Sequence, residues 1–61
     1  PMVLNGKHTL YNKNKQVSKD GVFKDNRLMD GKAYVYDENG ILERISVYKN
    51  GSYAGDTEIE K

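Results

Sequence analysis

The sequence predicts an all-β protein, an antiparallel meander of about five strands built from two hairpin repeats. Three observations carry this prediction. Short runs of alternating apolar and polar residues are separated by turn dipeptides such as Asn-Gly and Asp-Gly. No stretch has the 3.6-residue apolar periodicity of an amphipathic helix. A shift of 25 positions aligns Asn5-Gly6-Lys7 with Asp30-Gly31-Lys32, which indicates an internal repeat.

The repeat divides one small domain, residues 1–61, into a first copy at about 5–29, a second at about 30–54 and a truncated third at 55–61. A chain of 61 residues buries only about 60% of its unfolded surface. Its apolar fraction of 36% predicts a thin core. Cysteine is absent, so disulfides do not reinforce the domain. We therefore expect a sister chain or another protein to complete the core.

The first copy predicts strands at residues 7–12 and 16–24, joined by a three-residue loop at 13–15. A hairpin loop of this kind needs a left-handed residue at its last position. That residue is Lys15, for which the conformation costs about 1 kcal/mol, whereas the second copy has Gly40 there. We expect the first hairpin to be the weaker one. Asp20-Gly21 predicts a bulge or sharp twist within the second strand.

Two-residue turns are predicted at Asp25-Asn26 and, in the second copy, at Asn50-Gly51. The first of these turns leads into a third strand at 27–36, which has a local bend at Asp30-Gly31. The turns fix the register of the strands that flank them. They place Phe23 opposite Leu28 and Tyr48 opposite Tyr53.

A fourth strand is predicted at 41–49, after a loop at 38–40, and a short fifth strand at 52–59. The acidic end of the fifth strand protects that edge of the sheet. Uninterrupted alternation from the 38–40 loop gathers the larger residues on one face. They are Tyr34, Tyr36, Leu42 and Tyr48, with Tyr11, Val17 and Phe23 from the first copy. The smaller residues on the other face are Val22, Ala33, Val35, Ile45 and Val47.

The second copy matches the pattern G-K-x-x-x-Y-D-E-N-G-x-L-x-x-x-x-x-Y-K-N-G-x-x-x-G between Gly31 and Gly55. This pattern resembles the MORN-repeat variant of many bacterial proteins, including YwqK-family antitoxins. The resemblance implies an array of antiparallel hairpins used for protein–protein contact, with lipid contact proposed for relatives, and it implies no catalytic residues. Two copies are fewer than a free-standing repeat array needs. We therefore expect the chain to be part of a longer array or to form a homo-oligomer.

The residue pattern predicts no enzyme, metal site or cofactor. His8 is the only histidine and has no cysteine or histidine partner for zinc. Residues 37–40, Asp-Glu-Asn-Gly, resemble part of a calcium loop but lack its downstream spacing, so they predict a turn. Pro1 invites comparison with the small tautomerases, whose amino-terminal proline is a catalytic base. No helix follows it as their β-α-β unit requires.

We expect a protein-interaction module that associates with itself or with another protein. The residues predicted at the interface are Tyr11, Phe23, Tyr34, Tyr36, Leu42 and Tyr48. The first strand, with His8 and Leu10, is predicted to be an edge that accepts a strand from another chain.

Charge separates the remaining partner classes. The net charge of +1 argues against a nucleic-acid partner. Residues 1–30 carry six Lys and Arg against three Asp, whereas residues 31–61 carry four against six Asp and Glu. This asymmetry has two interpretations, solvated faces or head-to-tail attraction between copies. The alternative function is an anionic-lipid or cell-envelope module, whose positive face would be formed by Lys7, Lys13, Lys15, Lys19 and Lys24.

Overall fold

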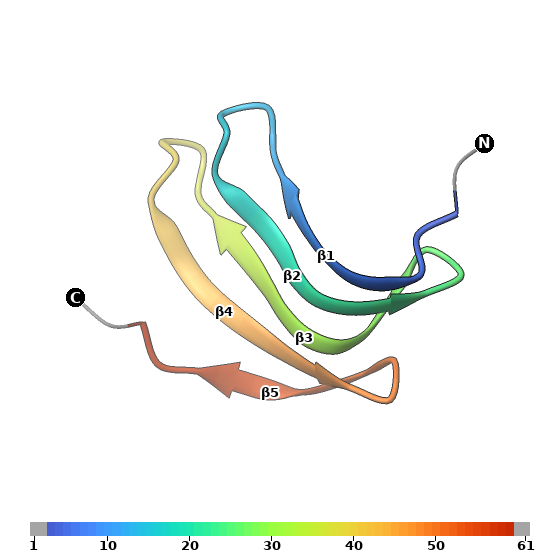
Figure 1. Cartoon of the computed structure of the whole chain (residues 1–61). Helices are drawn as coiled ribbons and strands as arrows, with labels where there is room; N and C mark the ends of the chain where they lie inside the picture. The colour runs from blue at the N-terminus through green and yellow to red at the C-terminus, as the bar shows by residue number, and fades with distance from the viewer. Residues whose placement is uncertain (1–2, 60–61) are drawn as a thin grey trace.

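In the computed structural model, which describes residues 3–59, the chain forms one open antiparallel sheet of five strands. The strands are β1 (Gly6–Tyr11), β2 (Val17–Lys24), β3 (Arg27–Tyr36), β4 (Leu42–Lys49) and β5 (Ser52–Thr57). They lie side by side in chain order, with β1 and β5 at the edges of a curved sheet (Figure 1). The described residues contain no helix. The predicted all-β meander is confirmed, and each strand begins and ends within two residues of its predicted bounds.

The β1–β2 and β3–β4 loops are built in the same way, 25 residues apart. The Asp37 carboxylate accepts hydrogen bonds from the backbone N–H groups two and four residues further on, at 2.8 and 2.9 Å. The Asn12 side chain accepts from the matching N–H groups of its own loop, at 2.9 and 3.1 Å. Lys15 and Gly40 are both left-handed, with φ of 63° and 79°. The predicted loop geometry is therefore confirmed.

The two-residue turns are also a matched pair. Asp25-Asn26 has φ values of 51° and 68°, and Asn50-Gly51 has 53° and 81°. Two positive φ values indicate the type I′ turn, whose twist suits a hairpin. Asn5 Oδ1 accepts from the first N–H of the β2–β3 turn at 3.2 Å, and Asp30 Oδ1 from the first N–H of the β4–β5 turn at 3.4 Å. The residues that the repeat aligns thus cap equivalent turns.

The pairing of strands agrees with the sequence near the turns and departs from it farther along. The pairs Phe23 with Leu28, Tyr48 with Tyr53 and Tyr36 with Leu42 are confirmed. Beyond Tyr36 the register shifts, because β4 contains an extra residue, Glu43, as a β-bulge. Each of the other strand pairs contains a similar shift. A shift of one residue exchanges the faces of everything beyond it.

Cross-strand partners share a face, so the register assigns the strand residues to two faces. We name them the Phe23 face and the Tyr34 face. The Phe23 face carries Gly6, His8, Leu10, Lys19, Gly21, Phe23, Leu28, Gly31, Ala33, Val35, Arg44, Ser46, Tyr48, Tyr53 and Asp56. The Tyr34 face carries Lys7, Thr9, Tyr11, Val17, Asp20, Val22, Lys24, Asp30, Lys32, Tyr34, Tyr36, Leu42, Ile45, Val47, Lys49, Gly55 and Thr57.

The prediction of one aromatic face and one face of smaller residues is therefore wrong. Phe23 and Tyr48 lie opposite the other four predicted interface residues, Tyr11, Tyr34, Tyr36 and Leu42. The bulges in β2 and β4 cause this exchange. The β2 bulge lies between the β1–β2 loop and Phe23, and the β4 bulge lies between the β3–β4 loop and Tyr48. Each bulge therefore reverses the face that the loop predicts for the aromatic residue. For the same reason Val22, Ile45 and Val47 join the tyrosines instead of opposing them.

The core is thin, as the composition predicts. Among the described hydrophobic residues only Phe23, Leu28 and Ile45 are buried. Phe23 pairs with Leu28, and its ring meets the His8 ring in a T-shaped arrangement, with 6.2 Å between the ring centroids. The larger hydrophobic residues that stay exposed are Val3, Tyr11, Val22, Ile41 and Tyr53. Both faces therefore retain apolar surface that no other element within residues 3–59 covers.

Candidate interaction surfaces

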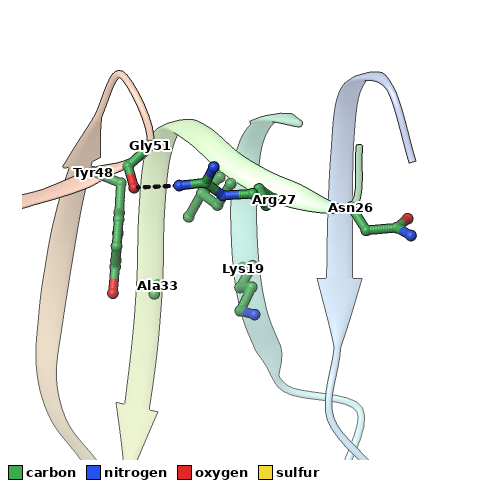
Figure 2. A pocket seen from close by; sticks show the side chains of 7 residues that line it. Lys19, Asn26, Arg27, Ala33, Tyr48 and Gly51 are labelled. Carbon is green, nitrogen blue, oxygen red and sulfur yellow. Dashed lines mark hydrogen bonds between the residues drawn. The ribbon is translucent and has the colours of Figure 1, made fainter. Parts of the chain in front are cut away.

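A shallow hollow of about 270 Å³ lies on the Phe23 face, next to the β2–β3 and β4–β5 turns (Figure 2). Its lining residues are Lys19, Asn26, Arg27, Leu28, Ala33, Tyr48 and Gly51. None of them is acidic. Arg27 extends along this end of the sheet and donates a long hydrogen bond, 3.5 Å, to the Gly51 carbonyl. The hollow thus combines a basic rim with apolar walls.

The size of the hollow limits what it can hold. Pockets for small molecules usually measure about 300–1,000 Å³ and enclose most of their ligand. This hollow is smaller, at about 270 Å³, and opens on one face of a sheet. It therefore suits one or two side chains of a partner protein better than a free metabolite.

Small residues form the Phe23 face beside the hollow. Gly21 and Gly31 are direct cross-strand partners in β2 and β3. A Cβ atom on Gly21 would lie 2.1 Å from the Asp30 carbonyl oxygen, and one on Gly31 would lie 2.2 Å from the Asp20 carbonyl oxygen. Only glycine fits this approach of the two backbones. Neither residue contributes a side chain to this face.

The β4–β5 half of the Phe23 face carries large side chains. The Tyr48 and Tyr53 rings meet edge to face, with 6.2 Å between their centroids. Tyr53 is 57% exposed. Its hydroxyl donates to the Asp56 carboxylate at 2.8 Å, and the Ser46 hydroxyl donates to the same oxygen at 3.3 Å. The hydrogen bond to Asp56 raises the pKa of Tyr53, while the positive charge of Arg44 opposes this shift.

The Tyr34 face has a hollow of its own, of about 310 Å³, near the end of β5. Its lining residues are Lys32, Leu42, Ile45, Thr57, Glu58 and Ile59. The Tyr36 hydroxyl donates to the Val17 carbonyl at 2.6 Å, so it is engaged within the sheet. Tyr34, Tyr36 and Leu42 are half-buried. Of the predicted interface residues on this face, only Tyr11 is mostly exposed.

The sequence-predicted interface residues thus have unequal access to a partner. Phe23 is 2% exposed and serves the core of its own chain. Tyr48 is half-buried and lines the hollow of the Phe23 face. Sequence reasoning paired Tyr53 with Tyr48 but did not place it at the interface. The sequence analysis also gives no role to Arg27, which lines the hollow, or to Asp56, which accepts a hydrogen bond from Tyr53. Their proximity to the tyrosine pair and the hollow depends on the register beyond the bulges.

The predicted edge residues His8 and Leu10 lie in β1, which is an edge strand of the sheet. Both side chains belong to the Phe23 face. The His8 ring packs against Phe23, and its Nε2 lies 2.9 Å from the Asn5 carbonyl oxygen. The outer side of β1 has no strand beside it within residues 3–59. Acceptance of a partner strand there stays a prediction.

The five lysines proposed as one positive face do not share a face. Lys7 lies on the Tyr34 face, and Lys19 lies on the Phe23 face. Lys13 and Lys15 belong to the β1–β2 loop. The alternation of side chains along β1 and β2 separates charges that are close in sequence. Lys7 and Lys19 therefore lie on opposite faces of the sheet.

The described residues contain no group of three or more His, Cys, Asp or Glu positioned to hold a metal ion. The Asp37 carboxylate, from the calcium-like segment, accepts hydrogen bonds within its own loop. Pro1, the residue compared with the tautomerases, lies outside the described residues. Within the described part of the chain, no helix is long and apolar enough to cross a membrane.

Comparison of the chain with protein-family models, curated proteins and solved structures finds no significant match.

Proposed function

We propose that the chain is a non-enzymatic protein-interaction module, built from MORN-like hairpin repeats, that associates with itself. The observation that carries this proposal is the open sheet, because both its faces and both its edges are uncovered within residues 3–59. Antiparallel sheets commonly pack one face against a core and leave the other in water. Here a partner is needed to supply that second layer.

The paired loops and turns support the repeat interpretation. Equivalent hydrogen bonds recur 25 residues apart, from Asn12 and Asp37 in the loops and from Asn5 and Asp30 at the turns. β2 and β4 also occupy positions that are 25 residues apart at both ends. Arrays of such repeats bury their hydrophobic surface by stacking on neighbours or partners. This supports a role in binding proteins rather than in chemistry.

Sedimentation equilibrium of the isolated chain over a wide concentration range tests self-association. We expect the mean molar mass to rise with concentration toward that of a small oligomer. A chain that stays monomeric at millimolar concentration would contradict self-association. Co-sedimentation with liposomes, with and without anionic lipid, tests the alternative module. We expect no difference between the two liposomes, and selective binding to the anionic ones would favour the lipid function.

The β1 edge offers a second kind of contact, addition of a strand by a partner protein. In such a complex, hydrogen exchange would be slowed at the outward-pointing amides of residues 8–11. Leu10→Pro should prevent this pairing and leave the β3–β4 hairpin folded, because Leu10 lies in β1. Fast exchange of these amides in both the free chain and its complexes would show that the edge is unused.

A further inference from the structure

Side-chain size on the Phe23 face changes halfway across the sheet. One row of cross-strand partners runs Gly21, Gly31, Tyr48 and Tyr53, from β2 to β5. The β2–β3 half of the row therefore has two glycines, and the β4–β5 half has two large rings. Consider a second copy packed face to face on the first, related to it by a twofold axis that runs parallel to the strands and lies above the boundary between β3 and β4. In this second copy the order of the row across the sheet is reversed. Tyr48 of one copy then lies over Gly31 of the other, and Tyr53 over Gly21.

Charge on the same face has the same self-complementary arrangement. The neighbouring row runs Lys19, Ala33, Ser46 and Asp56. Lys19 and Arg27 stand at the basic hollow on one side, and Asp56 stands on the other side beside Tyr53. Arg44, whose cross-strand partner is Val35, also lies on this face, in β4. The twofold axis therefore places Lys19 over Asp56 of the partner and Arg44 over Val35 of the partner.

About the same axis, the Tyr34 face lacks this complementarity. Its matching row runs Thr9, Asp20, Lys32, Val47 and Gly55. An axis between β3 and β4 would place Lys32 over Val47 of the partner and Asp20 over Gly55. Charged groups would then lose water without gaining a partner, which is unfavourable. For an axis between β3 and β4, the Phe23 face is therefore favoured, because there Lys19 gains Asp56 of the partner.

We propose that two copies of this chain associate through their Phe23 faces, about a twofold axis between β3 and β4. Tyr48 and Tyr53 of each copy pack over Gly31 and Gly21 of the other, beside its hollow, and Asp56 meets Lys19. An interface of this symmetry uses the same patch on both copies. Two aligned sheets can pack face to face in this way when the side chains of their inner faces interlock. This inference rests on the proposed function and adds its site and geometry.

Charge reversal tests the arrangement through dimer dissociation constants from sedimentation equilibrium. Lys19→Glu places a carboxylate against Asp56 of the partner, and Asp56→Lys places an ammonium group against Lys19. Each single variant should weaken the dimer by roughly tenfold or more, because both symmetric contacts become repulsive. The double variant Lys19→Glu/Asp56→Lys restores opposite charges and should recover most of the affinity. An equal mixture of the single variants should form heterodimers for the same reason.

Lys32→Glu is the matched control, since it makes the same charge change on the Tyr34 face. It should leave the dimer constant within a factor of about two, as expected for a site outside the interface. Circular dichroism of each variant establishes that it is folded, and recovery in the double variant excludes simple unfolding as the cause. A monomeric wild-type chain would overturn both this inference and self-association. An oligomer that is insensitive to Lys19→Glu, or more sensitive to Lys32→Glu, would overturn the geometry alone.

Discussion

Lys15 occupies a left-handed position that the second repeat gives to Gly40, with φ of 63° and 79°. A Cβ at Gly40 would contact only the side chain of Gln16, at 3.8 and 3.9 Å. The difference between the two loops is therefore one of backbone conformation and not of space. Left-handed backbone is less favourable for lysine than for glycine.

We predict that Lys15→Gly stabilises the chain by about 0.5–1 kcal/mol and that Gly40→Lys destabilises it by about the same amount. Urea denaturation of both variants at one protein concentration measures the change. A lower denaturation midpoint for Lys15→Gly than for the wild type would contradict this explanation of the first loop.

The pKa of Tyr53 should depend on the Asp56 carboxylate. The hydrogen bond to Asp56 stabilises the neutral phenol and so raises the pKa of Tyr53 in the folded state. The unfolded chain loses the phenol proton at lower pH, so this stabilisation is present below the unfolded pKa and is lost as pH rises through the folded value. Asp56→Asn should lower the Tyr53 pKa, measured from its ring resonances against pH. The same pKa in both proteins would show that the hydrogen bond is absent in solution.

At the scale of elements, the pair of glycines in β2 and β3 sets how closely these strands approach. Gly31→Ala would place its Cβ 2.2 Å from the Asp20 carbonyl oxygen, at a φ of 153°. Gly6→Ala has nothing within 4 Å of its Cβ, although its φ is 92°. The two substitutions therefore share backbone strain and differ in steric clash.

We predict that Gly31→Ala destabilises the chain by about 2–5 kcal/mol, from strain and overpacking together. Gly6→Ala should cost only about 1–2 kcal/mol, from its backbone conformation. Thermal unfolding followed by circular dichroism ranks the two. Equal losses of stability in the two variants would mean that β2 and β3 can move apart at Gly31 with little loss of stability.

The sequence predicts strands and turns well here because their causes are local. Asn-Gly, Asp-Asn and the three-residue loops each require a particular backbone shape, and they fix the pairs next to them, such as Tyr36 with Leu42. The bulge at Glu43 has no comparable local cause, because an extra residue in one strand is set by pairing along the whole hairpin. One unpredicted residue in β4 was enough to move Tyr48 to the opposite face. Of the six interface residues that the sequence predicts, only Tyr48 therefore belongs to the contact proposed from the structure.

At the scale of the whole molecule, the proposed dimer implies that stability depends on association, because the core is thin and the faces are open. A partner that binds the folded chain and not the unfolded one stabilises it by mass action. The midpoint of thermal unfolding should therefore rise with protein concentration. Lys19→Glu should weaken this concentration dependence, while Lys32→Glu should retain it. A midpoint that is independent of concentration for the wild type would show that the monomer is stable by itself.

Contact between the two Phe23 faces is measured most directly by nuclear Overhauser effects between copies. A sample made from equal parts of isotopically labelled and unlabelled chain distinguishes contacts between copies from those within one. The proposed dimer predicts contacts from the Tyr48 ring to the α-protons of Gly31 and from the Tyr53 ring to those of Gly21. Contacts between copies that involve Val47 and Tyr34 instead, with none from Tyr53, would contradict it.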